Sequence, residues 1–193
     1  MPASPTPTRS TASPEQTRTA MSVLDRVVDD LAMIVDRSFS VSGSKVERID
    51  RRAAGSGRVH ISFKLRFEVD GDERYGALLV PLPDAIALAC YLMMMPDDAV
   101  ADRRGDVELD QSTKDAILEV GNFVGGAVDA VLREVHGGDV RAKSAGCQGV
   151  RAGVRPAFPY VEGTELTLAS GTARLHEFQP FEILLMLPDL EVE

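Results

Sequence analysis

Two polar side chains that could do chemistry lie close together in the segment 110–137. Glu119 and Asn122 are three positions apart, and Asp115 precedes the glutamate by four. An α-helix turns by about 100° per residue, so it would place all three on one face. A carboxylate can pair with a cationic group, and a carboxamide oxygen can accept a hydrogen bond from water without adding charge. Glu119 and Asn122 are therefore the candidate catalytic pair, with Asp115 as an outer contact or a helix cap.

The rest of this segment predicts a helix with one buried side. The expected apolar stripe consists of Ile117, Val120, Val124, Val128, Val131 and Val135. The opposite stripe continues from the candidate pair through Gly126, Asp129 and Arg133. Gly125 and Gly126 each cost a helix about 1 kcal/mol relative to alanine, so their place in mid-helix predicts that something approaches closely there. We assign Asp115, Gly125 and Gly126 as candidate partner-binding positions.

The two ends of this helix are also predicted by sequence signals. Ser112 followed by Asp115 resembles a capping box at the start, although aspartate is not its usual second member. The pair Gly137 and Gly138 marks the end.

Other chemistries find little support. The three histidines, His60, His136 and His176, lie far apart without further ligands at metal-binding spacing, so no metal site is expected. Neither a glycine-rich phosphate loop nor a serine nucleophile elbow is present. Cys90 and Cys147 are too few for a disulfide framework and favour buried thiols. A nucleophilic Cys147 is disfavoured because no helix or histidine partner follows it.

The composition sets the class of protein. The chain has 193 residues, 44% of them hydrophobic, with a net charge of −9. The acidic balance argues against nucleic acid and against an anionic membrane surface as partners. The most apolar run, 85–95, is too short to span a bilayer, and the N-terminus has no secretory signal. We therefore expect a cytoplasmic protein.

The chain divides into an N-terminal tail and a predicted single domain. Residues 1–20 are rich in Pro, Ser and Thr and predict a disordered tail, so the domain is expected over 21–193. It would begin with a helix over 22–37, capped by Ser22. The apolar helix 84–95 is expected in the core, including its methionine triplet, and the acidic segment 97–110 is expected as a loop.

The remaining elements predict strands. The segment 59–69 alternates and predicts a strand with one solvent-exposed face, joined by a hairpin turn at Asp70-Gly71 to a strand over 74–81. Hairpin-linked strands with few helices indicate an α+β fold, an antiparallel sheet with long helices packed on one face. The other expected strands are 41–50, 139–145, 150–155, 165–170, 173–178 and 181–187.

The run AILEVGNFVGGAVDAVL, residues 116–132, resembles the signature helix of the CheC/CheX family of response-regulator phosphatases. In that family an Asp or Ser, three residues, Glu, two residues and Asn mark the active face, and Asp115, Glu119 and Asn122 match this pattern. The order of elements over 22–188 resembles the CheX branch.

The resemblance implies an enzyme that stimulates hydrolysis of the aspartyl phosphate of a CheY-type receiver in chemotaxis. Asn122 would orient the water and Glu119 would pair with the receiver's lysine. The receiver would bring its own Mg²⁺, so the chain needs no cofactor. CheX-branch members pair their subunits, which implies a homodimer.

Two departures from the CheC pattern keep alternatives open. CheC members tend to carry a proline 23 residues after the asparagine, where this chain has Ala145, and many carry a second Glu/Asn pair, which the helix 84–95 lacks. A single site fits the CheX branch. A non-catalytic binding module of the flagellar-switch type, or a diverged sensor-linked domain, stays an alternative.

Overall fold

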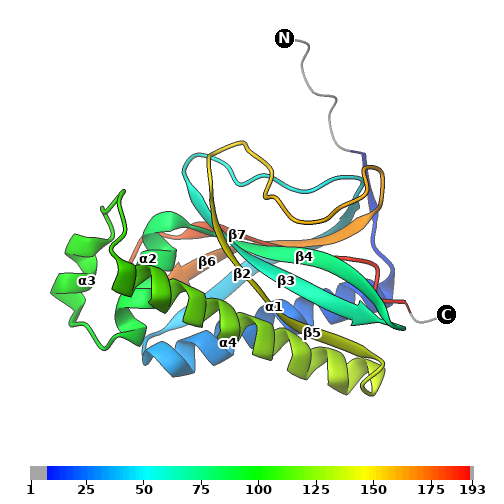
Figure 1. Cartoon of the computed structure of the whole chain (residues 1–193), viewed down its shortest axis with the longest axis horizontal. Helices are drawn as coiled ribbons and strands as arrows, with labels where there is room; N and C mark the ends of the chain where they lie inside the picture. Colours follow the sequence, from blue (N-terminus) through cyan, green and yellow to red (C-terminus); the bar gives the residue numbers. More distant parts are fainter. Residues whose placement is uncertain (1–7, 192–193) are drawn as a thin grey trace, which may run out of the picture.

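The computed structural model describes residues 8–191, which are built around one antiparallel sheet (Figure 1). The strand order across the sheet is β1-β2-β6-β7-β4-β3-β5, and every pairing is antiparallel. The predicted α+β class is thus confirmed. The strands are β1 (Arg9–Thr11), β2 (Phe39–Ile49), β3 (His60–Val69), β4 (Asp72–Pro81), β5 (Val140–Val150), β6 (Leu166–Leu175) and β7 (Phe181–Leu187).

Two long helices, α1 (Pro14–Val35) and α4 (Gln111–His136), lie side by side on one face of this sheet. The short helices α2 (Leu82–Leu92) and α3 (Asp97–Arg103) close one end of this layer, on the left in Figure 1. The main core lies between helices and sheet, and Phe63 and Phe67 of β3 are among its largest fully buried side chains. Burial of such aromatic side chains contributes roughly 2–3 kcal/mol each.

The opposite face of the sheet is covered by the connections 50–59 and 151–165, which lie above it in Figure 1. A second apolar cluster, including Leu79, Leu168 and Phe158, fills this side. The expected exposed face of 59–69 is therefore wrong at its start, where His60 and Ser62 are buried. A Cβ atom on Gly55 would stand 2.4 Å from the His60 ring, so the connection 50–59 rests directly on this histidine.

The predicted disorder of residues 1–20 and the predicted helix start at Ser22 are both wrong over residues 9–20. Here β1 pairs with β2, and α1 already begins at Pro14. Ser13 caps the helix: its hydroxyl accepts from the Gln16 N–H, and the Gln16 side chain accepts from the Ser13 N–H. This capping box supplies the local order that a Pro/Ser/Thr composition conceals. Residues 1–7 of the expected tail lie outside the described residues.

Other boundaries confirm or correct the predicted elements. The hairpin at Asp70-Gly71 is confirmed, with both residues at positive φ (51° and 85°) as a two-residue turn requires. The acidic segment 97–110 is not all loop, because its first half forms α3. Of the five strands expected after α4, 181–187 is confirmed as β7, and 139–145 forms part of the longer β5. The expected strands 165–170 and 173–178 are one strand, β6, and the strand expected over 150–155 is wrong beyond Val150. Gly171 does not interrupt β6; it lets β2 pass close by, since a Cβ there would stand 2.7 Å from Val41.

Candidate functional site

Glu119 and Asn122 lie together on the exposed face of α4, as predicted from their spacing. The Asn122 Nδ2 donates a hydrogen bond of 2.9 Å to Glu119 Oε2. The amide nitrogen can only donate, so this contact turns the NH₂ end of the Asn122 side chain toward Glu119. Asn122 Oδ1 receives no hydrogen bond from any residue between 8 and 191, and it is left facing solvent as an acceptor.

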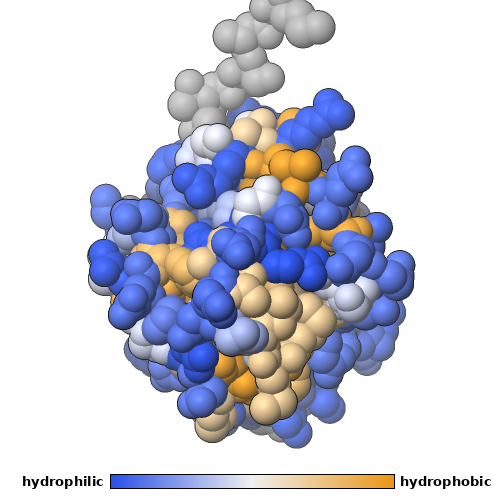
Figure 2. Space-filling model, turned by 90° about the vertical axis from the view of Figure 1, so that its left-hand side faces the viewer, coloured by the Kyte–Doolittle hydropathy of each residue, from blue (hydrophilic) through white to orange (hydrophobic). Residues whose placement is uncertain are grey.

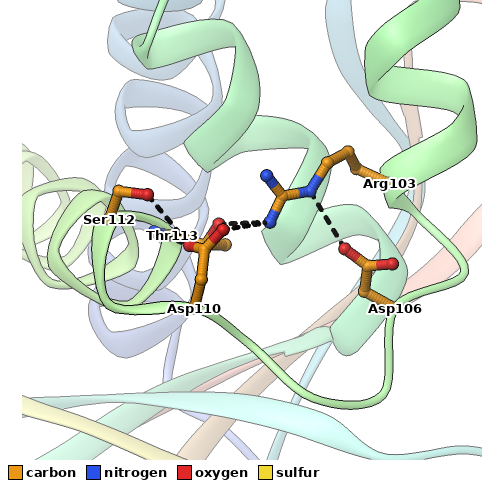
Figure 3. Close-up of polar contacts among 5 residues, drawn as sticks. All are labelled: Arg103, Asp106, Asp110, Ser112 and Thr113. Carbon is orange, nitrogen blue, oxygen red and sulfur yellow. Dashed lines mark hydrogen bonds and ion pairs between the residues drawn. The ribbon is translucent and has the colours of Figure 1, made fainter.

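The start of α4 is held by Asp110, so the predicted cap of Ser112 with Asp115 is wrong (Figure 3). Asp110 Oδ1 accepts from the Thr113 N–H at 2.8 Å, which satisfies a free donor of the first turn. Arg103 of α3 contacts the other carboxylate oxygen at 2.8 Å. Hydrogen bonds from Thr113, Arg103 and Ser112 lower the pKa of Asp110, so it stays charged at neutral pH.

Asp115 is free of any capping role and lies exposed on the same face as Glu119. Its carboxylate accepts a hydrogen bond of 2.7 Å from Gln111 Nε2, one turn earlier. Asp115, the predicted outer contact, therefore lies beside the Glu119–Asn122 pair, four residues before Glu119. A carboxylate in this position extends the acidic surface toward the helix start.

The two glycines of α4 lie in different environments, and only one of them is at the exposed face. Gly125 packs against β5: a Cβ on it would stand 2.5 Å from the Ser144 backbone nitrogen. The proposal of Gly125 as a partner-binding position is therefore wrong, because its bare backbone serves helix–strand packing. Gly126 has open space around it and lies one turn beyond Asn122. It leaves the surface beside the amide free for an approaching molecule.

Asp129 also departs from the predicted polar stripe, because it is buried against β5. Its carboxylate accepts two hydrogen bonds from Arg141, at 2.8 and 3.1 Å, and one of 2.9 Å from the Ala142 N–H. Arg133 adds an ion pair at 3.2 Å. Burial disfavours the charge of Asp129, but these contacts outweigh it and lower the pKa. The i,i+4 spacing to Arg133 was the only sequence signal of this ion-paired group, and Arg141 lies too far along the chain to be inferred.

The apolar stripe of α4 is buried as predicted, except at its end. Val120, Val124 and Val128 are fully enclosed, whereas Val135 is 45% exposed in the last turn. The helix then ends at Gly137, whose φ of 64° confirms the predicted glycine cap.

The surroundings of Cys147 disfavour a reactive thiolate. Cys147 is partly buried with its Sγ 3.7 Å from the Ile117 carbonyl, and burial raises its pKa to about 11, so it does not ionise near neutral pH. Within residues 8–191 no three His, Cys, Asp or Glu side chains are grouped closely enough to hold a metal ion. No helix of the same residues is long and apolar enough to cross a membrane.

Sequence reasoning missed one buried ion pair near the α2–α3 end. Asp84 is 1% exposed, and its carboxylate lies 2.8 Å from Arg104. Burial raises the pKa of Asp84 to about 6 despite this partner. The Arg104 guanidinium in turn lies 3.7 Å from the centre of the Phe178 ring. The ion pair thus joins the start of α2 to the end of α3 and fixes these two short helices relative to each other.

Comparison with known proteins identifies the fold. No protein-family model matches this chain, and no curated protein matches it in sequence. The solved structures that match include FliY of Thermotoga maritima (TM-score 0.65, 12% identity, 92% of this chain and 91% of FliY). They also include the FliM middle domain from H. pylori (0.60, 12%, 92% and 94%) and CheX from Desulfovibrio desulfuricans (0.56, 15%, 88% and 97%). The chain therefore has the fold of CheX chemotaxis proteins and of FliM and FliY, as its sequence pattern predicted.

Proposed function

We propose that this chain is a response-regulator phosphatase, which uses Glu119 and Asn122 to stimulate hydrolysis of the aspartyl phosphate of a CheY-type receiver. The observation that supports this most directly is the exposed, hydrogen-bonded Glu119–Asn122 pair beside the open position at Gly126. Its fold, shared with CheX chemotaxis proteins, is consistent with this role.

The proposed chemistry is the positioning of one water molecule. Asn122 Oδ1 accepts a hydrogen bond from the water, whose oxygen attacks phosphorus opposite the aspartyl oxygen. The P–O bond to the aspartate breaks, its electron pair stays with the aspartate as a carboxylate, and the phosphoryl group leaves as inorganic phosphate (H₂PO₄⁻), which carries both protons of the water. Such reactions depend mainly on alignment and on stabilisation of charge. A neutral amide suits this position because a carboxylate would repel the phosphoryl group.

Glu119 has two roles in this proposal. Its Oε2 accepts from Asn122 Nδ2 and so keeps Oδ1 turned outward. Its other oxygen is available to the lysine of the receiver, which also brings the Mg²⁺ that this chemistry needs. Asp115, one turn earlier, adds negative charge for docking.

The test is single-turnover decay of a phosphorylated CheY-type receiver over a range of concentrations of this protein. Asn122→Ala should lower the plateau rate on the order of 10²-fold, because alignment is lost, while half-saturation stays unchanged. Glu119→Ala should also shift half-saturation to higher concentration, and Glu119→Lys should shift it further because like charges meet. Gly126→Leu should weaken docking without unfolding the helix, since its Cβ meets no atom within 4 Å.

A matched control is Glu134→Ala, an exposed carboxylate twelve residues beyond Asn122 on the same helix. With this variant, the phosphorylated receiver should lose its phosphate at the wild-type rate. Equal decay with wild type, Asn122→Ala and Glu119→Ala would refute the phosphatase proposal.

A second candidate function is a non-catalytic module of the flagellar-switch type. It is favoured by the TM-scores of FliY from Thermotoga maritima (0.65) and FliM from H. pylori (0.60), which exceed the 0.56 of CheX from Desulfovibrio desulfuricans, and by a matching structure described as a FliG–FliM complex from H. pylori. Receiver binding without any acceleration of phosphate loss would support this candidate.

A further inference from the structure

Two methionines stand in solvent at the end of the molecule formed by α2, α3 and the last turn of α1. Met94 is 91% exposed and Met33 is 74% exposed. The predicted core packing of the triplet 93–95 is therefore wrong for Met94. Figure 2 shows a continuous hydrophobic patch in the lower half of this end of the molecule, among hydrophilic side chains.

The backbone of Met94 makes this exposure more telling. Met94 follows the last turn of α2 and has a φ of 60°, in the left-handed region that normally holds glycine. Its N–H donates to the Tyr91 carbonyl at 2.8 Å, and the Met95 N–H donates to the Cys90 carbonyl at 3.0 Å. This is a Schellman motif with methionine in the glycine position. The strained backbone turns a large apolar side chain outward, where it gains no packing.

Arg37 joins the end of α1, which carries Met33, to the α2–α3 connection, which carries Met94. Arg37 follows Met33 by four residues, just beyond the end of α1, and its Nε contacts Asp97 at 2.9 Å. The same guanidinium lies 4.8 Å from the centre of the Tyr91 ring, three residues before Met94. The end of α1 is thus joined to both sides of the α2–α3 connection.

The charges around this surface are acidic. Its arginines, Arg37, Arg103 and Arg104, are all engaged with carboxylates of the chain. In contrast, Asp29 and Asp102 form no ion pair with any residue from 8 to 191, and Asp98 contacts only the next backbone N–H. Asp29 lies one turn before Met33, and Asp98 lies four residues after Met94.

We propose that Met33 and Met94 anchor a cationic amphipathic helix of a partner protein. Methionine side chains are flexible and polarisable, so they adapt to different apolar surfaces. The free carboxylates would meet lysine or arginine on the helix flanks. A second copy of this chain fits less well, because a two-fold contact would bring these acidic groups against themselves. The inference stands apart from the proposed phosphatase activity, since it uses neither Glu119 nor Asn122.

The first test uses the full-length chain labelled with ¹³C at its methionine methyl groups. The probe is a synthetic amphipathic helix of leucine and lysine, and the control is a peptide of the same composition in scrambled order. The amphipathic peptide should shift the methyl signals of Met33 and Met94 and leave that of Met186, which is fully buried, unchanged. Equal shifts with both peptides would show charge attraction without a docking site and would overturn the proposal.

The second test uses Met94→Gly, which should separate binding from folding. Glycine relieves the left-handed strain, so the melting temperature should not fall, while peptide binding should weaken at least tenfold. Val161→Gly is the matched control, because Val161 is 76% exposed in the connection 151–165 and should leave binding unchanged. Wild-type affinity in Met33→Gln/Met94→Gly would overturn the proposal. A second result would also overturn it. If the Met33 and Met94 signals shift with protein concentration in the absence of peptide, and the protein then has twice its 20.8 kDa mass, the occupant of this surface is a second copy.

Discussion

One helical stripe of α4 has two halves that differ in almost every physical respect. In the first half, Glu119 and Asn122 hydrogen-bond with each other and with no other side chain of residues 8–191, and Gly126 has open space around it. In the second half, Asp129 is buried and bound by two arginines and a backbone N–H. The residue types and their helical spacing are similar, so the difference comes from what the sheet places beside them.

Strand β5 creates that difference. It pairs with β3 at one edge of the sheet and supplies Arg141 and the Ala142 N–H to the second half of the helix. At Gly125 the strand comes so close that no side chain fits between the two backbones. The second half is therefore a structural joint, and the first half is left free to meet another molecule.

The largest effect is expected from Asp129→Ala. It leaves Arg141 and the buried Ala142 N–H without their acceptor, which should cost about 2–3 kcal/mol of unfolding free energy. Urea unfolding measures this directly. Exposed Asp115→Ala is the control and should change the unfolding free energy by less than about 0.5 kcal/mol.

The same substitution should change the pH dependence of stability. The pKa of Asp129 is lowered in the folded chain from its ordinary value of 3.8. Its contribution is thus present above pH 3.8 and is lost as the pH falls through the folded value. Asp129→Ala should therefore lose less stability than wild type over this acidic range. If the unfolding free energies of wild type and Asp129→Ala fall in parallel as the pH is lowered, the charge of Asp129 does not stabilise the fold.

The two neighbouring glycines give the next largest effect, with opposite signs. Gly125→Ala would drive a Cβ into the Ser144 backbone, 2.5 Å away, and should destabilise the fold by about 1–3 kcal/mol. Gly126→Ala meets nothing and improves helix propensity, so it should stabilise by up to about 1 kcal/mol. Thermal melts of the two variants side by side test the contrast, and equal melting temperatures would refute it.

Much of the fold follows from local patterns in the sequence. The period of α4, its glycine cap and the Asp70-Gly71 hairpin were predictable, because each depends on residues close in the chain. The positions of Glu119 and Asn122 on one exposed face followed from the same periodicity. Their chemical assignment needed more, namely the resemblance of 116–132 to a known signature helix.

Contacts between distant segments were not predictable. Gly125 and Gly126 are identical in sequence terms, and only the path of β5 assigns one to packing and the other to the surface. The alternation of 59–69 predicts an exposed His60, because nothing local shows that the connection 50–59 folds over it. The start of α1 was a different kind of error, since its capping box at Ser13 and Gln16 was present but hidden by the composition of 1–20.

The smallest effect on stability is expected at the candidate pair itself. Asn122→Ala removes one exposed hydrogen bond and replaces a poor helix former with the best one, so these contributions nearly cancel. The unfolding free energy should stay within about 0.5 kcal/mol of wild type, or rise slightly. Glu119→Ala should behave the same way, because Asn122 is the one hydrogen-bond partner of Glu119 among residues 8–191. Exposed positions generally tolerate such substitutions, so any loss of activity in these variants would then reflect lost chemistry and not lost folding. A loss above about 1 kcal/mol in Asn122→Ala would instead give both halves of the stripe a structural role, and would remove the basis for treating the first half as the active face.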